Sequence, residues 1–270
     1  MGGITLHTHG CRGSSPVAGA DFDHYGGITT CFEIMTGSDR VILVDAGTGI
    51  HSLLNSRPAD TRYSIFLTHV HWDHIQGLPF FTPLYDPDAD IEFYGRPVDG
   101  LSIAEAIEGV MKPPFFPVSF LGSASLKRYP DLDGGARLGD LAVGWTALYH
   151  PSGVTGYRFE KDGRVLVIAT DVEAGDADSD RAVRQLAAGA DVLVHDAQYL
   201  PDEYAASKTG WGHSTWEHAV AVAVDAGVGQ LVLTSHDPDR TDAQVEAIVT
   251  AARSFFPNTL AAYTGMSLQV

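Results

Sequence analysis

Basic residues are scarce in this sequence. It has 17 Lys and Arg against 34 Asp and Glu, so its formal net charge is −17 when histidine is neutral. A surface of this sign repels phosphate backbones over any extended contact. We therefore expect that extended nucleic acid is not a partner of this protein.

Cysteine and long apolar runs are also scarce. The two cysteines, Cys11 and Cys31, cannot build a disulfide framework and follow no Cys-x-x-Cys spacing, so we expect reduced thiols in a cytoplasmic protein. No stretch approaches the roughly 18 apolar residues of a membrane span. The first residues show no basic segment followed by an apolar one. We expect no contact with a membrane.

The chain has enough apolar material for one large domain. Hydrophobic residues make up 44% of its 270 residues and charged ones 19%, which are ordinary values for a globular protein. This length fits one large α/β domain, so we expect a single domain over 1–270. Residues 79–130 carry many prolines, and we interpret them as a loop-rich insertion at the rim of a site.

Short runs rich in Val, Ile and Leu alternate with helical patterns. The runs cover residues 40–44, 63–67, 164–168, 192–194 and 230–233, and several are apolar at successive positions, as in strands covered on both faces. The helical patterns cover residues 102–110, 180–188, 215–226 and 242–255. This alternation predicts an α/β fold with helices on the outside of the sheet.

Polar residues follow directly after each of these apolar runs. In chain order they are Asp45, Thr68-His69, Thr170-Asp171, His195-Asp196 and Ser235-His236. Ligands of layered α/β folds bind beyond the strand ends. One site could therefore collect clusters that are far apart in the sequence.

The densest cluster is a His-x-His-x-Asp-His motif. His69, His71, Asp73 and His74 follow the apolar run at 63–67. Imidazole nitrogens and a carboxylate suit zinc and similar divalent ions, and alternation puts His69 and His71 on one side of an extended turn. Asp73 and His74 would then face a second ion a few ångströms away, as in paired-metal hydrolases. The competing interpretation is a solvated, histidine-rich turn.

The motif resembles the signature of the metallo-β-lactamase superfamily. The resemblance implies a four-layer αβ/βα sandwich with two divalent metal ions at the edge between two sheets, and zinc is favoured over manganese and iron. It also implies the full ligand set: His69, His71 and His150 on one ion, Asp73, His74 and His236 on the other, and Asp171 bridging them. By themselves, His150 and His236 could equally be structural histidines.

A second element points to one branch of that superfamily. Gly212-His213-Ser214-Thr215 resembles the His-Ser-Thr element of the ribonuclease Z and phosphodiesterase branch, in which the histidine assists the leaving oxygen. The resemblance implies that His213 and Asp73 are catalytic and that Asp196, where ribonuclease Z has Glu, orients His213. Alternatively, Ser214 and Thr215 only cap the helix that follows.

The resemblance and the charge together favour a small substrate. The long arm of bacterial ribonuclease Z is absent between His150 and Asp171, and residues 79–130 offer few cations, namely Arg96, Lys112, Lys127 and Arg128. We therefore predict a phosphodiesterase for a small or cyclic phosphodiester. The alternatives are a tRNA 3′-processing endonuclease of the ribonuclease Z type and a non-phosphate hydrolase (lactonase or thioesterase) or accessory binder in cofactor biosynthesis. A homodimer is compatible with all three.

Overall fold

Two β-sheets form the centre of the protein in a computed structural model that describes residues 3–53 and 61–270. Over these residues each sheet has seven strands. The first has the order β14 (Ser267–Gln269), β1 (Thr5–Gly10), β2 (Cys31–Met35), β3 (Arg40–Val44), β4 (Arg62–Phe66), β5 (Asp90–Tyr94) and β6 (Leu126–Arg128). The second has the order β13 (Thr259–Ala261), β12 (Gln230–Thr234), β11 (Val192–Asp196), β10 (Arg164–Ala169), β9 (Val154–Lys161), β8 (Leu141–Leu148) and β7 (Ala136–Leu138).

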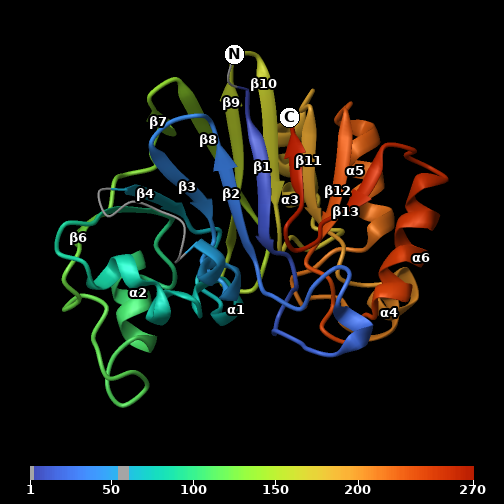
Figure 1. Cartoon of the computed structure of the whole chain (residues 1–270). Coiled ribbons are helices and arrows are strands. Elements are labelled where there is room, and N and C mark those ends of the chain that lie inside the picture. The colour runs from blue at the N-terminus through green and yellow to red at the C-terminus, as the bar shows by residue number, and fades with distance from the viewer. Residues whose placement is uncertain (1–2, 54–60) are drawn as a thin grey trace.

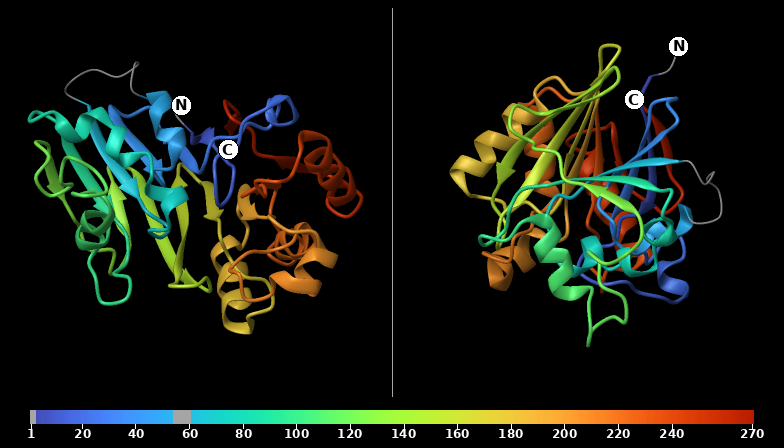
Figure 2. Two further views of the ribbon diagram at one scale, coloured as in Figure 1. Left: turned by 90° about the horizontal axis from the view of Figure 1, so that it is seen from below. Right: turned by 90° about the vertical axis from the view of Figure 1, so that its left-hand side faces the viewer.

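Helices cover the outer faces of both sheets (Figures 1 and 2). The α-helices are α1 (Trp72–Ile75), α2 (Ile103–Val110), α3 (Ala177–Ala187), α4 (Pro201–Glu203), α5 (Trp216–Asp225) and α6 (Asp242–Arg253). Short 3-10 turns are η1 (Ala20–Phe22), η2 (Thr48–Leu53), η3 (Leu78–Phe80) and η4 (Thr82–Tyr85), and η5 (Tyr204–Lys208) is a π-helical turn. Among the described residues, no helix is both long and apolar enough to cross a membrane.

Three large apolar cores lie between the layers, and a small fourth cluster contains Tyr25, Val245, Val249 and Ala261. Between the sheets, Phe66 of β4 stacks on Tyr94 of β5 at 4.4 Å between ring centroids and meets Tyr157 of β9 edge-on at 5.4 Å. A second core joins the outer face of the second sheet to α3, α5 and α6, and a third joins the first sheet to α1, α2 and the 3-10 turns. The predicted αβ/βα sandwich is therefore confirmed.

The predicted strands match the central strands of both sheets. β3, β4 and β5 run parallel in one sheet, and β10, β11, β12 and β13 run parallel in the other. The segment 79–130 contains α2, which we predicted at 102–110, and two strands that we did not predict, β5 and β6. Because β5 and β6 pair within the first sheet, this part of the segment extends the sheet.

The parallel strands deliver their polar clusters to one end of the two sheets, where α1 also lies (Figure 1). Asp45, Asp171 and Ser235, which follow β3, β10 and β12, have φ values of 64°, 54° and 59°. Such positive φ values are uncommon for residues other than glycine and cluster at functional sites. The chain therefore turns sharply at each of these strand ends.

Candidate active site

Three histidines meet at one point of this edge. His69 follows β4, His71 precedes α1 and His150 follows β8, and their ligand nitrogens lie within 4.8 Å of one another. Nδ1 of His71 lies 3.0 Å from Nε2 of His150. Burial lowers the pKa of His69, His71 and His150, so each ring is neutral and offers a lone pair.

Hydrogen bonds orient two of these rings. Nδ1 of His69 lies 3.0 Å from Oγ1 of Thr68, and Nδ1 of His150 donates to the carbonyl oxygen of Gly212 at 2.6 Å. Each contact occupies Nδ1 and leaves Nε2 for another partner, the usual arrangement of metal-binding histidines. Gly212 is required here, because a Cβ at its position would lie 2.1 Å from Nδ1 of His150, and its φ is +91°.

His74 and two carboxylates form a second group beside the first. Nε2 of His74 lies 3.3 Å from Oδ2 of both Asp73 and Asp171, and its Nδ1 donates to Asp45 at 2.7 Å. Although burial lowers the pKa of His74, the carboxylates of Asp171, Asp73 and Asp45 raise it well above its ordinary value. This negative surrounding attracts a cation.

The two groups fit divalent metal ions. Nε2 of His69 is buried and has no hydrogen-bond partner among the described residues, and Nε2 of His74 and Oδ2 of Asp171 face each other at 3.3 Å without a hydrogen bond of good geometry. Leaving a polar atom unpaired in the interior costs about 1–3 kcal/mol, and such atoms are rare without a functional reason. Because the atoms are nitrogen and carboxylate oxygen and converge, a metal such as zinc would satisfy all three.

A His-Asp pair lies next to both groups. Nδ1 of His213 donates to Oδ2 of Asp196 at 2.7 Å and lies 3.7 Å from Oδ1 of Asp171. Burial lowers the pKa of His213, but the carboxylates of Asp196 and Asp171 outweigh this effect and raise the pKa to about 9. The ring of His213 is 5.3 Å from that of His150.

Backbone hydrogen bonds fix the carboxylate of Asp196, which is the partner of His213. Its Oδ1 accepts from the amide of Ser214 at 2.7 Å and from that of Gln198 at 3.2 Å, and its Oδ2 also accepts from the amide of Asp171 at 3.1 Å. The side chain is fully buried. The next element also fits the second interpretation of the sequence motif, since Thr215 caps α5 through the amide of His218. The structure therefore shows the helix cap, and the catalytic role of His213 stays a prediction that this cap does not exclude.

Two histidines of the strand-end clusters lie outside these groups. The resemblance implied that His236 is a ligand of the second ion, but among the described residues His236 belongs to none of the groups whose ligand atoms lie within 4.8 Å of one another, and Nε2 of its buried ring contacts the carbonyl oxygen of Ala262 at 2.9 Å. The preceding residue, Ser235, has a φ of 59°, and its buried Oγ has no hydrogen-bond partner among the described residues. His195 is packed inside, with its Nδ1 on the carbonyl oxygen of Asp196.

Sequence reasoning gave no role to Asp45 and did not single out Glu173. Asp45 also accepts from the amide and hydroxyl of Thr68, so it fixes two parts of the metal motif at once. Glu173 is buried and accepts from the amides of Gly210 and Gly212, which positions the loop that holds His150. The place of Asp45 after a strand was a usable signal, whereas Glu173 has none in the sequence.

Comparison with known proteins places the chain in a family. The sequence model of the beta-lactamase superfamily domain matches residues 40–236. The ribonuclease Z of Bradyrhizobium sp. is 30% identical over 271 residues, covering 84% of this chain and 88% of that protein. The ribonuclease Z of Lactococcus lactis is 28% identical over 274 residues, with 82% and 86% covered.

A solved structure agrees in fold. The metallo-beta-lactamase fold protein YhfI from Bacillus subtilis superimposes with a TM-score of 0.76 at 20% identity, over 99% of this chain and 100% of that one. Likeness at this identity concerns the fold alone, but it extends over the whole domain. The chain therefore belongs to the metallo-β-lactamase superfamily, in its ribonuclease Z-like branch.

Proposed function

We propose that this metal-dependent hydrolase is a phosphodiesterase that acts on a small phosphodiester. The observation that carries the proposal is the buried pair of His213 and Asp196 next to the histidine and carboxylate groups. Hydrolysis of a phosphodiester releases an alkoxide, which leaves poorly unless it is protonated. A protonated His213, whose charge the carboxylate of Asp196 stabilises, would supply that proton.

The proposed ligands are those that converge. His69, His71 and His150 would hold one ion, Asp73 and His74 would hold a second, and Asp171 would lie between them. When bound, the ions would act as Lewis acids that neutralise charge on the phosphate oxygens.

The chain's own residues would do the rest. Asp45 and Gly212 fix the rings of His74 and His150, and Asp196 fixes His213 by its Nδ1 proton. Nε2 of His213 then carries the proton given to the leaving oxygen.

Three of the four cations of residues 79–130 are engaged within the fold, which supports a small substrate. Nζ of Lys127 donates to the carbonyl oxygens of Ser123 and Ser125, Arg128 pairs with Asp90, and the guanidinium of Arg96 lies 5.2 Å from the centre of the Trp145 ring. Charges engaged within the fold offer little to a polyanion. In addition, the interval between His150 and Asp171 consists of β9, β10 and the short turn between them.

The relatives favour a second candidate function. Proteins named ribonuclease Z match more than four-fifths of the chain, and this supports processing of the 3′ end of precursor tRNA. The net charge of −17 and the lack of an arm between β9 and β10 argue against docking a large polyanion. The first candidate therefore remains our proposal.

A substrate panel separates the two candidates. Zinc-loaded or manganese-loaded protein should hydrolyse bis-p-nitrophenyl phosphate and a small cyclic phosphodiester, and should leave an unmodified precursor tRNA uncut over the same time. Release of nitrophenolate and gel analysis of labelled RNA give the two readouts. Efficient cleavage of the precursor tRNA would favour the ribonuclease, and hydrolysis of lactones or thioesters alone would exclude both.

Metal binding should occur in two unequal steps. The first ion would have three imidazoles, while the second would have Asp73, His74 and a share of Asp171, without His236. Calorimetric titration of metal-free protein with Zn²⁺ should therefore show a tight step and a step at least tenfold weaker.

Elemental analysis of two variants checks this assignment. His74→Gln should lose the second equivalent, whereas His236→Gln should keep both. Loss of an equivalent in His236→Gln would instead identify His236 as a ligand that swings into the site.

A further inference from the structure

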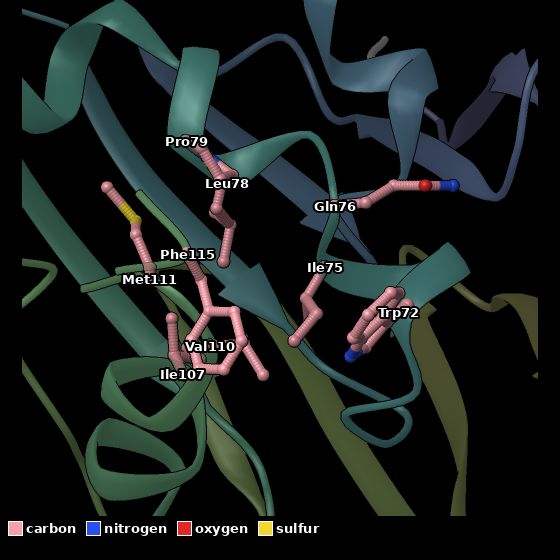
Figure 3. Close-up of a pocket in the computed structure, with 9 residues that line it drawn as sticks. All are labelled: Trp72, Ile75, Gln76, Leu78, Pro79, Ile107, Val110, Met111 and Phe115. Carbon is pink, nitrogen blue, oxygen red and sulfur yellow. The ribbon is translucent and has the colours of Figure 1, made fainter. Parts of the chain in front are cut away.

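An apolar cavity lies against the helix that carries two of the proposed metal ligands. It has a volume of about 290 Å³ and lies between α1 and η3 on one side and the end of α2 on the other. Its walls are almost entirely hydrocarbon and aromatic, and are formed by Trp72, Ile75, Leu78, Val110 and Phe115, among others. Figure 3 shows these side chains around a common space, while Gln76 points away from it.

The cavity shares one helical turn with the site. In α1, Trp72 and Ile75 are three residues apart and lie on one face. Asp73 and His74, which lie between them in the chain, are the proposed ligands of the second ion. Trp72 lines the cavity and directly follows His71 in the chain, so the cavity lies against the segment that carries the metal motif.

Two aromatic side chains at this cavity are unusually exposed. Trp72 is 71% and Phe115 is 73% exposed, although both are large and apolar. Contiguous exposed apolar surface on a soluble protein marks a place where a ligand or partner binds. The single amide in the lining is already engaged, because Nε2 of Gln76 donates to Oγ1 of Thr29 at 3.0 Å. Among the described residues, the walls thus offer little that could read the polar edge of a nucleobase.

We propose that this cavity binds an apolar ester group of the substrate, so that the substrate class is a phosphodiester with an alkyl or aryl arm. This inference rests on the proposed phosphodiesterase activity. The size agrees, because an apolar cavity of about 150 Å³ already holds a benzene molecule. Each methylene that the cavity buries should strengthen binding about fourfold, which corresponds to about 0.8 kcal/mol.

A series of alkyl p-nitrophenyl phosphates tests the inference with a constant leaving group. From the methyl to the hexyl ester, kcat/KM should rise at least tenfold for the metal-loaded enzyme. In Phe115→Ala the hexyl-to-methyl ratio should fall below about threefold. Phe255→Ala is the matched control, because Phe255 is 70% exposed but lies beyond the end of α6, and there the ratio should equal that of the unmodified enzyme.

Binding of alkylphosphonates gives a readout that needs no turnover. Hexylphosphonate should bind at least tenfold more tightly than methylphosphonate, as measured by calorimetry, and Phe115→Ala should remove most of this difference. Hydrolysis that does not depend on chain length, or that depends on it equally in Phe115→Ala, would overturn the apolar subsite and leave the phosphodiesterase standing. Absence of any phosphodiester hydrolysis would remove the proposed function, and the phosphonates alone would then decide whether the cavity is a binding site.

Discussion

Replacing His213 by alanine should slow hydrolysis of an alkyl phosphodiester by about 10² to 10⁴, the usual worth of general-acid assistance. The same variant should affect p-nitrophenyl esters far less, because nitrophenolate leaves without protonation. Metal content should stay unchanged. The physical reason is the bond from His213 to Asp196, which keeps the imidazole charged and aimed from a position next to the proposed ligands. The measurement is the steady-state rate on each substrate, and the effect is the ratio of the rate loss on the alkyl phosphodiester to the rate loss on the p-nitrophenyl ester.

His218→Ala is the matched control for this experiment. His218 lies on α5 and pairs with Asp180 at 2.8 Å, so its loss should leave the ratio of the two rates unchanged. Equal losses on both substrates in His213→Ala would indicate that His213 binds the phosphate. Loss of metal would make it a ligand, a real alternative because its ring lies within ligand distance of His150 and Asp171. Either result would remove the general-acid assignment.

Asp196→Asn also tests the pair of His213 and Asp196, but its result is harder to interpret than that of His213→Ala. The carboxylate accepts from three backbone amides besides the imidazole, so an amide NH₂ at this position would face N–H donors. Such a contact leaves buried donors unpaired and destabilises the fold. A loss of activity in Asp196→Asn must therefore be read together with its melting temperature, whereas the His213 variant removes one side chain only.

The central strands and the metal motif could be predicted because their signals are local. The run Arg40–Val44 is β3 itself, and its continuous apolar character follows from its place between two covered faces. The four residues of the motif lie within one short segment after β4, so their proximity needs no knowledge of the fold. By contrast, β6, β7, β13 and β14 have only three residues each, too few to show a period.

The position of His236 and the apolar cavity could not be predicted, because both depend on distant contacts. Ser235 has a φ of 59°, and positive values are uncommon for residues other than glycine, so the sequence does not indicate the turn that precedes His236. Backbone hydrogen bonds between the residues at 11–13 and His236 then fix the turn. The cavity likewise arises where α1 and the end of α2 pack together, although they are far apart in the sequence.

Removal of metal should lower the melting temperature by about 10 °C. The proposed ligands come from segments after β4, β8 and β10, so an ion that binds them ties together both sheets. Binding a ligand at a thousand times its dissociation constant stabilises the folded state by about 4 kcal/mol, and each kcal/mol moves the melting temperature of a chain of this size by roughly 2–4 °C. Differential scanning calorimetry before and after EDTA treatment, and again after Zn²⁺ is restored, measures the shift.

A variant that lacks the proposed ligand His69 makes this test specific. His69→Ala should melt below the loaded wild-type protein, and EDTA should lower its melting temperature only slightly, because the missing ring lies within 4.8 Å of ligand atoms in both groups. Phe255→Ala should keep the full EDTA shift.

The two ions should contribute unequally to this shift. Part of the stability lost with the ions is regained in the metal-free protein, since protonated His74 pairs with Asp73 and Asp171 at 3.3 Å. Nε2 of His69 has no hydrogen-bond partner among the described residues, so most of the shift should come from the ion that His69, His71 and His150 would hold. Equal melting temperatures for loaded and verified metal-free protein would contradict the convergence of these ligands on metal.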